Sequence, residues 1–444
     1  MHGMKLLAFE RTPRLLRTRL AAMLVSVLGF SAAQAATDVQ VWVSLIPHNQ
    51  EVFDDLVDDF NSEQSEVRVE VKTFDTSRQI EPALLERVKG KQKTPHLVQI
   101  DDNRDPEALA VQKHITPLYT LLAKYPLKDT QWFVAPQNLS MRDIRGRLLA
   151  FPYMIDVPVM FYNIRAFEKA GLVPAVPQRS WYGLQEQLVD LANKATRKCP
   201  AITDQSVSVN LENLAAVNKQ FFTSADNGTK AESAAFTFDI TFVRHLSLMI
   251  AWVRSELLVD PEPNVFAPDQ FAADLCSVLW SESSNIGRFI ESDALKFGLT
   301  GLPYYPQVTE MPGSPFLDGT GLWATSGHSD AEHKATVQFL AWLAEPDNAA
   351  RWYQETGFLP LTKQAFEQTP ESYYKDHGIE PWRELVAVYA KPPSETGRGF
   401  KIKNYPQIRQ MFHEKLEEAL GGQYPAVTTL TTAKSEATRI MQGK

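Results

Sequence analysis

Strand and helix patterns alternate over the segment from residue 37 to residue 100, and this alternation constrains the fold more than any other feature. Apolar residues recur at every second position in residues 39–43 and 67–71, which predicts strands. Residues 52–60 and 80–88 carry apolar side chains at helical spacing, and residues 97–100 form a third, short apolar strand. Strands that alternate with helices predict an α/β fold with a largely parallel sheet.

Acidic residues follow the third of these strands directly. In open α/β sheets, ligands bind beyond the carboxyl ends of the strands, and Asp101 and Asp102 stand at such an end. We expect Asp102 to accept hydrogen bonds from ligand hydroxyl groups or to face a cation. The alternative is a solvated turn or a helix N-cap, which is the favoured interpretation for Asp101.

Asp156 is a single acid within the nearly apolar segment 151–163. Pro158 predicts a kink or edge character there. An unpaired buried carboxylate is costly, so Asp156 must face a cleft or a partner. We predict a position in a cleft, with a structural ion pair as the alternative.

The amino-terminal 35 residues are typical of a secretory signal. Residues 1–19 carry five basic residues and one acid, an apolar run spans 20–30, and Ala33-Gln34-Ala35 supplies a cleavage site. The apolar run is shorter than the roughly 20 residues of a membrane span, although an uncleaved anchor is the alternative. We therefore expect a periplasmic protein.

The rest of the chain has the length and charge of an exported two-lobe protein. The whole chain carries −8 and the signal +4, which leaves −12 for residues 36–444. This balance excludes an electrostatic footprint for nucleic acid, and the length favours two lobes.

Two cysteines, Cys199 and Cys276, are present. An exported compartment permits a disulfide, but two buried thiols are an equally good interpretation. Because no CxxC, HExxH or other metal-binding spacing is found, we predict neither a metal nor a cofactor.

The chain resembles the extracellular solute-binding proteins of ABC importers, in the maltose-binding group, and most closely the glycerol-3-phosphate-binding members. The resemblance covers nearly all of the chain after the signal. It rests on the order and spacing of several segments: 37–61, Pro152, 158–163, Ser180-Trp181, Cys199, 211–213, Cys276, 356–363 and 404–409.

The resemblance implies a periplasmic-binding-protein type II-like fold with two α/β lobes. Lobe one would comprise residues 37–153 plus 305–355, and lobe two residues 154–304 plus 356–444. Three crossing segments, near 153–160, 297–325 and 355–362, would form the hinge. The implied partners are an ABC permease and ATPase, and the protein would act as a monomer.

The resemblance also implies a substrate-binding set. Its members are Arg78, Asp102, Asp156, Gln205 with Ser208 nearby, Gly319, Thr320, Phe358 and Lys401. Lys401 stands where the glycerol-phosphate-binding members have an arginine and lacks the bidentate fork that suits phosphate. Asp156 would repel a nearby phosphate.

The function predicted from the sequence is capture of a sugar, a polyol or a phosphorylated polyol for an ABC importer, without catalysis. Two alternatives remain open. One is an exported glycosidase that uses Asp102 and Asp156 as paired carboxylates. The other is a ligand sensor or adhesin module that serves no importer.

Overall fold

The structure is a computed structural model that describes residues 36–100, 105–230, 234–259 and 266–443. The predicted signal, residues 1–35, lies outside the described residues, as do Asp101 and Asp102. Within these four described ranges, no helix combines the length and the apolar character that crossing a membrane requires.

The first sheet contains the predicted strands and three others. Its main path runs β2-β1-β3-β10-β4, and β5 also pairs with β10. The strands are β1 (Thr37–Val43), β2 (Val67–Thr73), β3 (Leu97–Ile100), β4 (Ile115–Thr116), β5 (Phe151–Asp156) and β10 (Asp318–Thr325). The central strand β1 buries Val39, Val41 and Val43, as the alternation of its sequence predicts.

This sheet is mixed, which corrects the prediction of a largely parallel one. Strand β1 is parallel to β2 and β3, but β10 is antiparallel to β3, β4 and β5. The strand and helix patterns in residues 37–100 could indicate only how the strands of that segment, β1, β2 and β3, pair with one another. Strand β10 enters the sheet from more than 200 residues later in the chain.

The second sheet has the order β7-β8-β6-β9. Its strands are β6 (Pro158–Asn163), β7 (Cys199–Thr203), β8 (Cys276–Glu282) and β9 (Phe297–Thr300). Cys199 and Cys276 are register partners of the parallel pair β7–β8, and their sulfurs form a disulfide. Of the two interpretations that the sequence left open, a disulfide and two buried thiols, the structure shows the disulfide.

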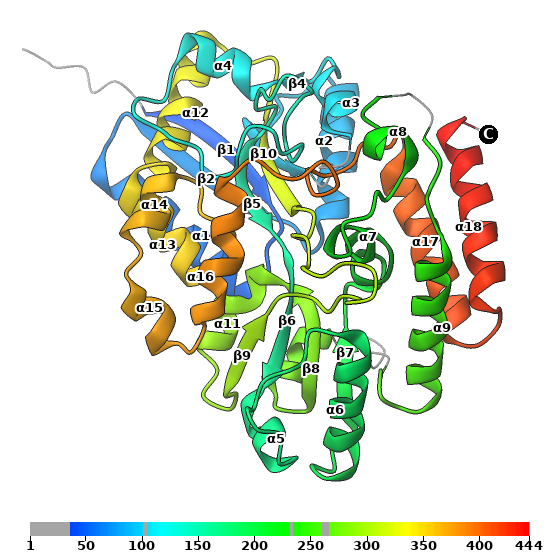
Figure 1. Ribbon diagram of the computed structural model, residues 1–444. Coiled ribbons are helices and arrows are strands. Elements are labelled where there is room, and N and C mark those ends of the chain that lie inside the picture. Colours follow the sequence, from blue (N-terminus) through cyan, green and yellow to red (C-terminus); the bar gives the residue numbers. More distant parts are fainter. Residues whose placement is uncertain (1–35, 101–104, 231–233, 260–265, 444) are drawn as a thin grey trace, which may run out of the picture. The chain divides into compact units, whose positions relative to one another are not determined.

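Helices cover both sheets (Figure 1). Helices α1 and α12 pack on the first sheet, and α6 and α10 pack on the second. The C-terminal α17 and α18 lie beside α9. The helices are α1 (Pro47–Glu63), α2 (Ile80–Lys89), α3 (Pro106–Ala110), α4 (Leu118–Lys124), α5 (Ile164–Lys169), α6 (Trp181–Asn193), α7 (Asn213–Val217), α8 (Ser224–Asn227), α9 (Ile240–Arg254), α10 (Ala267–Ala272), α11 (Ile286–Ile290), α12 (Asp330–Leu343), α13 (Pro346–Thr356), α14 (Lys363–Gln368), α15 (Glu371–Asp376), α16 (Glu380–Ala387), α17 (Tyr405–Leu420) and α18 (Ala426–Met441).

The chain passes from one sheet to the other at two places that matter for the site. Val157 alone separates β5 in the first sheet from β6 in the second, and residues 301–317 connect β9 back to β10. Figure 1 shows β5 and β6 following one another between the sheets. The strand ends nearest these crossings carry acidic residues, Asp156 on β5 and Asp318 on β10.

Candidate functional site

A cavity of about 660 Å³ lies between the two sheets. One wall comes from the end of β3, the end of β5 and the start of β10, and the other from the end of β8 and the polar turn that follows β7. The described residues that line it include Arg78, Ile100, Asp156, Asp204, Gln205, Ser206, Ser208, Glu282, Asp318, Gly319, Thr320, Tyr405 and Arg409. Strand ends from both sheets therefore converge on one hollow, which is the usual position of a ligand in α/β folds.

Most of the residues predicted from the sequence line this cavity. Arg78, Asp156, Gln205, Gly319 and Thr320 do so, and Ser208 also belongs to the lining. The prediction for Asp102 concerns a residue outside the described part of the chain, although Ile100, at the end of β3, lines the cavity.

Phe358 and Lys401 lie elsewhere. The Phe358 ring is buried and stacks on Trp352, with 5.3 Å between the ring centroids. The Lys401 ammonium forms an ion pair with Glu107. Neither side chain is among the residues lining the cavity. Phe358 packs in the aromatic core instead, and Lys401 pairs with the Glu107 carboxylate.

Asp156 is buried at the cavity wall. Only 4% of its surface is exposed, and Ser284 Oγ donates a hydrogen bond of 2.7 Å to its Oδ2. The carboxylate therefore lies at the cleft, where the sequence predicted it, and Ser284 is one of its partners.

Arg409 on α17 joins two carboxylates. Its Nε lies 3.1 Å from Glu212 Oε1, and its Nη2 donates to Asp318 Oδ2 at 3.0 Å. Tyr405 donates its hydroxyl hydrogen to the same Glu212 oxygen. The two carboxylates hold the pKa of Arg409 well above its usual value, against the opposing effect of burial. Because both partners are negative, this guanidinium is already neutralised within the protein.

Glu282 differs from its neighbours in the surroundings of its carboxyl group. Both of its carboxyl oxygens are buried, and neither has a hydrogen-bond partner among the described residues. Burial, and then the charges of Asp156 and Asp318, raise its pKa well above the usual value of 4.5, while Arg409 opposes the shift. Glu282 therefore retains its proton at a pH where an exposed glutamate has lost it.

Asp204 follows β7 and faces the same cavity. Water can reach this residue through the cavity, yet surrounding protein atoms dehydrate its carboxyl and raise its pKa to about 6. A hydrogen bond from Ser281 and the charge of Arg288 oppose the shift. A second hollow of about 500 Å³ also borders Asp204 and Ser206.

Gly319 allows β5 and β10 to approach each other at the cavity. Its φ is +83°, and a Cβ atom there would lie 2.1 Å from the carbonyl oxygen of Met154. A glycine permits such a close approach, and β5 makes one here. Any side chain would displace the strand that carries Asp156.

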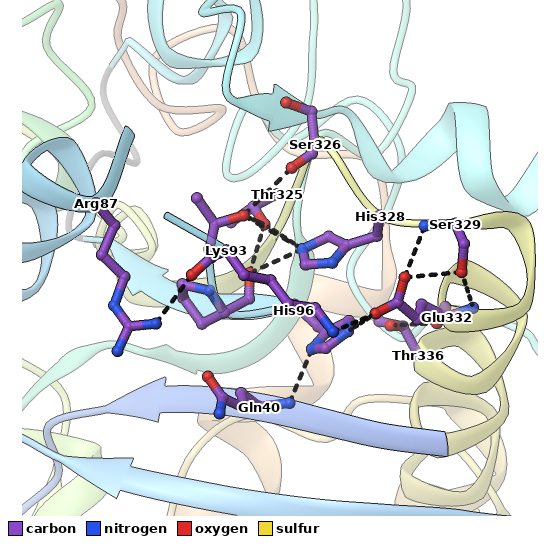
Figure 2. A network of polar contacts seen from close by, with 12 residues as sticks. Gln40, Arg87, Lys93, His96, Thr325, Ser326, His328, Ser329, Glu332 and Thr336 are labelled. Carbon is purple, nitrogen blue, oxygen red and sulfur yellow. Dashed lines mark hydrogen bonds and ion pairs between the residues drawn. The ribbon is translucent and has the colours of Figure 1, made fainter. Parts of the chain in front are cut away.

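A separate cluster brings His96, His328 and Glu332 close enough to share a metal ion (Figure 2). The linear spacing of these residues gave no sign of it. However, the Gln40 N–H donates to His96 Nδ1, so the ring proton of neutral His96 stands on Nε2, toward Glu332.

The other groups of this cluster are also engaged. Lys93 Nζ lies 2.5 Å from Glu332 Oε1, and His328 Nε2 lies within 3.2 Å of Pro95 O. The His96 and His328 rings stack with centroids 4.1 Å apart, so their nitrogen lone pairs do not converge on one point. The cluster is a hydrogen-bonded junction between β3 and the start of α12.

Comparison with known proteins identifies the family. Residues 55–381 match the model of the bacterial extracellular solute-binding proteins. The chain belongs to this family. Its members bind solutes and are not catalysts, and the chain is a solute-binding protein rather than an enzyme.

Curated relatives match over nearly their full length. The sn-glycerol-3-phosphate-binding periplasmic protein UgpB of Agrobacterium fabrum is 28% identical over 94% of this chain and 96% of its own. The protein of the same name from Escherichia coli O6:K15:H31 is 26% identical over 96% of this chain and 98% of its own.

Solved structures share the fold at lower identity. UgpB from Mycobacterium tuberculosis in complex with glycerophosphocholine superposes with a TM-score of 0.73 at 18% identity, over 92% of this chain and 99% of its own. Maltose-bound MalE3 of T. maritima also gives 0.73, at 17% identity, over 91% of this chain and all of its own. The solute-binding protein therefore has the two-lobe α/β fold of periplasmic binding proteins.

Proposed function

We propose that this solute-binding protein captures a sugar, a polyol or a glycerol-phosphate-like solute in the cavity between its sheets and delivers it to an ABC importer. The observation that carries the proposal is that hydrogen-bonding groups from strand ends of both sheets line a single hollow. The names of its relatives support a periplasmic location and a small polar ligand.

The cavity is suited to hydroxyl groups. Asp156 and Asp204 accept hydrogen bonds from them, Gln205 and Ser206 can donate or accept, and Arg78 can donate. A solute that lacks one of the matching hydroxyls would leave a dehydrated carboxylate without its donor, which gives the site its selectivity.

Closure of the two lobes would complete the site. The chain passes between the sheets at Val157 and over residues 301–317, so a rotation about these segments would bring the two walls together. In this proposal the moving bodies are residues 37–153 with 305–355 and residues 154–304 with 356–444. A permease and an ATPase in the membrane would then recognise the closed form.

A thermal-shift screen of the protein against sugars, polyols and their phosphates tests the proposal, because only the folded state binds the solute. The solute that raises the melting temperature most should lose its effect in Asp156→Asn. Asp58→Asn removes an exposed carboxylate of α1 and is the matched control.

Two results would contradict the proposal. One is a complete absence of stabilising solutes in the panel, and the other is equal stabilisation of Asp156→Asn and wild type. Small-angle scattering provides a second readout, since the stabilising solute should reduce the radius of gyration if the lobes close.

A further inference from the structure

The charges around the cavity are strongly unbalanced. The described lining contains the acids Glu81, Asp156, Asp204, Glu282 and Asp318, against the bases Arg78 and Arg409 and the residue His413. Arg409 is already bound to Asp318 and to Glu212, and Arg78 is exposed in the short 3-10 turn Ser77–Gln79 that precedes α2. Among the described lining residues, the acidic side chains therefore outnumber the basic ones.

Glu282 is the centre of this imbalance. It ends β8, and the charged groups that act on it are Asp156 from β5, Asp204 after β7, Asp318 from β10 and Arg409 from α17. Both of its oxygens are buried at the cavity without a hydrogen-bond donor in the described part of the chain. A buried carboxyl surrounded by other acids requires either a proton or a cation.

Described protein groups donate hydrogen bonds to Asp156 and Asp318, but none of the described groups donates one to Glu282. Ser284 donates to Asp156, and Arg409 donates to Asp318. Both oxygens are therefore available to accept hydrogen bonds from a solute in the cavity. This observation is independent of the count of acids, because it concerns two particular oxygen atoms.

We propose that the solute is a polyol or sugar that carries a protonated primary amine, and that its ammonium group binds beside Glu282, Asp156 and Asp204. The inference rests on the proposed function and adds a chemical class to its ligand. An ammonium group brings one positive charge and three N–H donors to a site that has acceptors in excess.

Other classes of ligand fit the same site less well. A phosphate group would add negative charge next to several carboxyl groups, and a hydroxyl group donates one hydrogen bond without compensating any charge. A quaternary ammonium has no N–H donors and is generally bound by aromatic rings. Tyr405 is the single phenylalanine, tyrosine or tryptophan among the described lining residues.

Matched solutes test the proposal by isothermal titration calorimetry at neutral pH. One set shares a three-carbon chain: 3-amino-1,2-propanediol, glycerol and sn-glycerol 3-phosphate. The other shares a sugar ring: glucosamine, glucose and N-acetylglucosamine, of which the last retains the nitrogen but loses its charge. We expect the amine in at least one set to bind at least about tenfold more tightly than its partners.

The variant Glu282→Gln tests whether Glu282 is the group that binds the ammonium. It keeps the size of the side chain and removes its charge, so the preference for the amine should fall to less than about threefold, which is a small difference in binding free energy. Glu51→Gln removes an exposed carboxylate of α1 and should leave the preference unchanged. If Glu282→Gln does not fold, wild type provides the test instead.

For wild type, titrations in buffers of different ionisation enthalpy measure the protons released on binding. Binding of an ammonium group should release a proton, because the positive charge favours ionised Glu282. Binding without proton release would contradict the assignment of the ammonium to this residue.

The two proposals fail in different ways. If a neutral or phosphorylated member of a set binds as tightly as the amine, or if only non-amine solutes bind, the amine inference is wrong and the solute-binding function stands. If neither these sets nor the wider panel of sugars and polyols contains a ligand, both proposals are wrong.

Discussion

Arg409 should be a structural anchor of the site rather than a free binding group for an anionic ligand. Glu212, whose side chain is fully buried, and Asp318, whose side chain is 11% exposed, both contact it. In Arg409→Met the side chain keeps much of its length, but the ion pairs with Glu212 and Asp318 are lost.

The size of the effect follows from these contacts. Removing one partner of a buried ion pair costs about 3–5 kcal/mol, and we expect the lower part of this range because the Arg409 side chain is 36% exposed toward the cavity. Unfolding entropy is about 2 cal/mol/K per residue. For a chain of this length, a loss of 1 kcal/mol therefore lowers the melting temperature by about 1 °C.

Differential scanning calorimetry at neutral pH provides the assay. Arg409→Met should melt about 3–4 °C below wild type. Arg68→Met is the matched control, because Arg68 and Glu70 form an exposed pair 3.9 Å apart. If both variants melt at the wild-type temperature while Arg409→Met loses its ligand, Arg409 binds the solute and the argument is wrong.

Three further predictions concern the fold around the site. Replacing Cys199 and Cys276 by alanine opens a cross-link over 77 residues and should lower the free energy of unfolding by about 4 kcal/mol, as measured by urea denaturation. Gly319→Ala should be less stable than Gly327→Ala, since both glycines have positive φ but only the first would press a Cβ against a neighbouring strand; equal melting temperatures would contradict this reasoning. Burial lowers the pKa of His245 to about 3, so the unfolded chain takes up this proton first as the pH falls below 6.5. Stability should therefore decrease by up to about 1.4 kcal/mol per pH unit between pH 6.5 and about 3, and His245→Gln should flatten that part of the pH profile.

Some of the residues that line the cavity could be predicted from the sequence. Asp156 is a single acid in an apolar segment, and that contrast alone predicts a residue that faces a cleft. Gly319 came from the family resemblance, and it lies at the cavity where β5 approaches β10. Arg78 and Gln205 came from the family resemblance, and both line the cavity.

The rest of the site depends on contacts between distant segments. Glu282 ends an apolar strand, and Arg409 lies on a helix whose apolar spacing predicts only packing. Their roles arise because residues 156, 282, 318 and 409 meet between the two sheets, which no local pattern records. The same limit explains β10, whose antiparallel insertion into the first sheet follows from pairing over more than 200 residues.

Calorimetric titration of the mature protein with sugars and polyols, followed by mass spectrometry of the solute, tests the central claim most directly. Capture between the sheets predicts one solute bound per chain, recovered chemically unchanged, with binding lost in Asp156→Asn. Conversion of the solute, or equally tight binding by Asp156→Asn, would show that the cavity beside Asp156 does not have the role assigned to it.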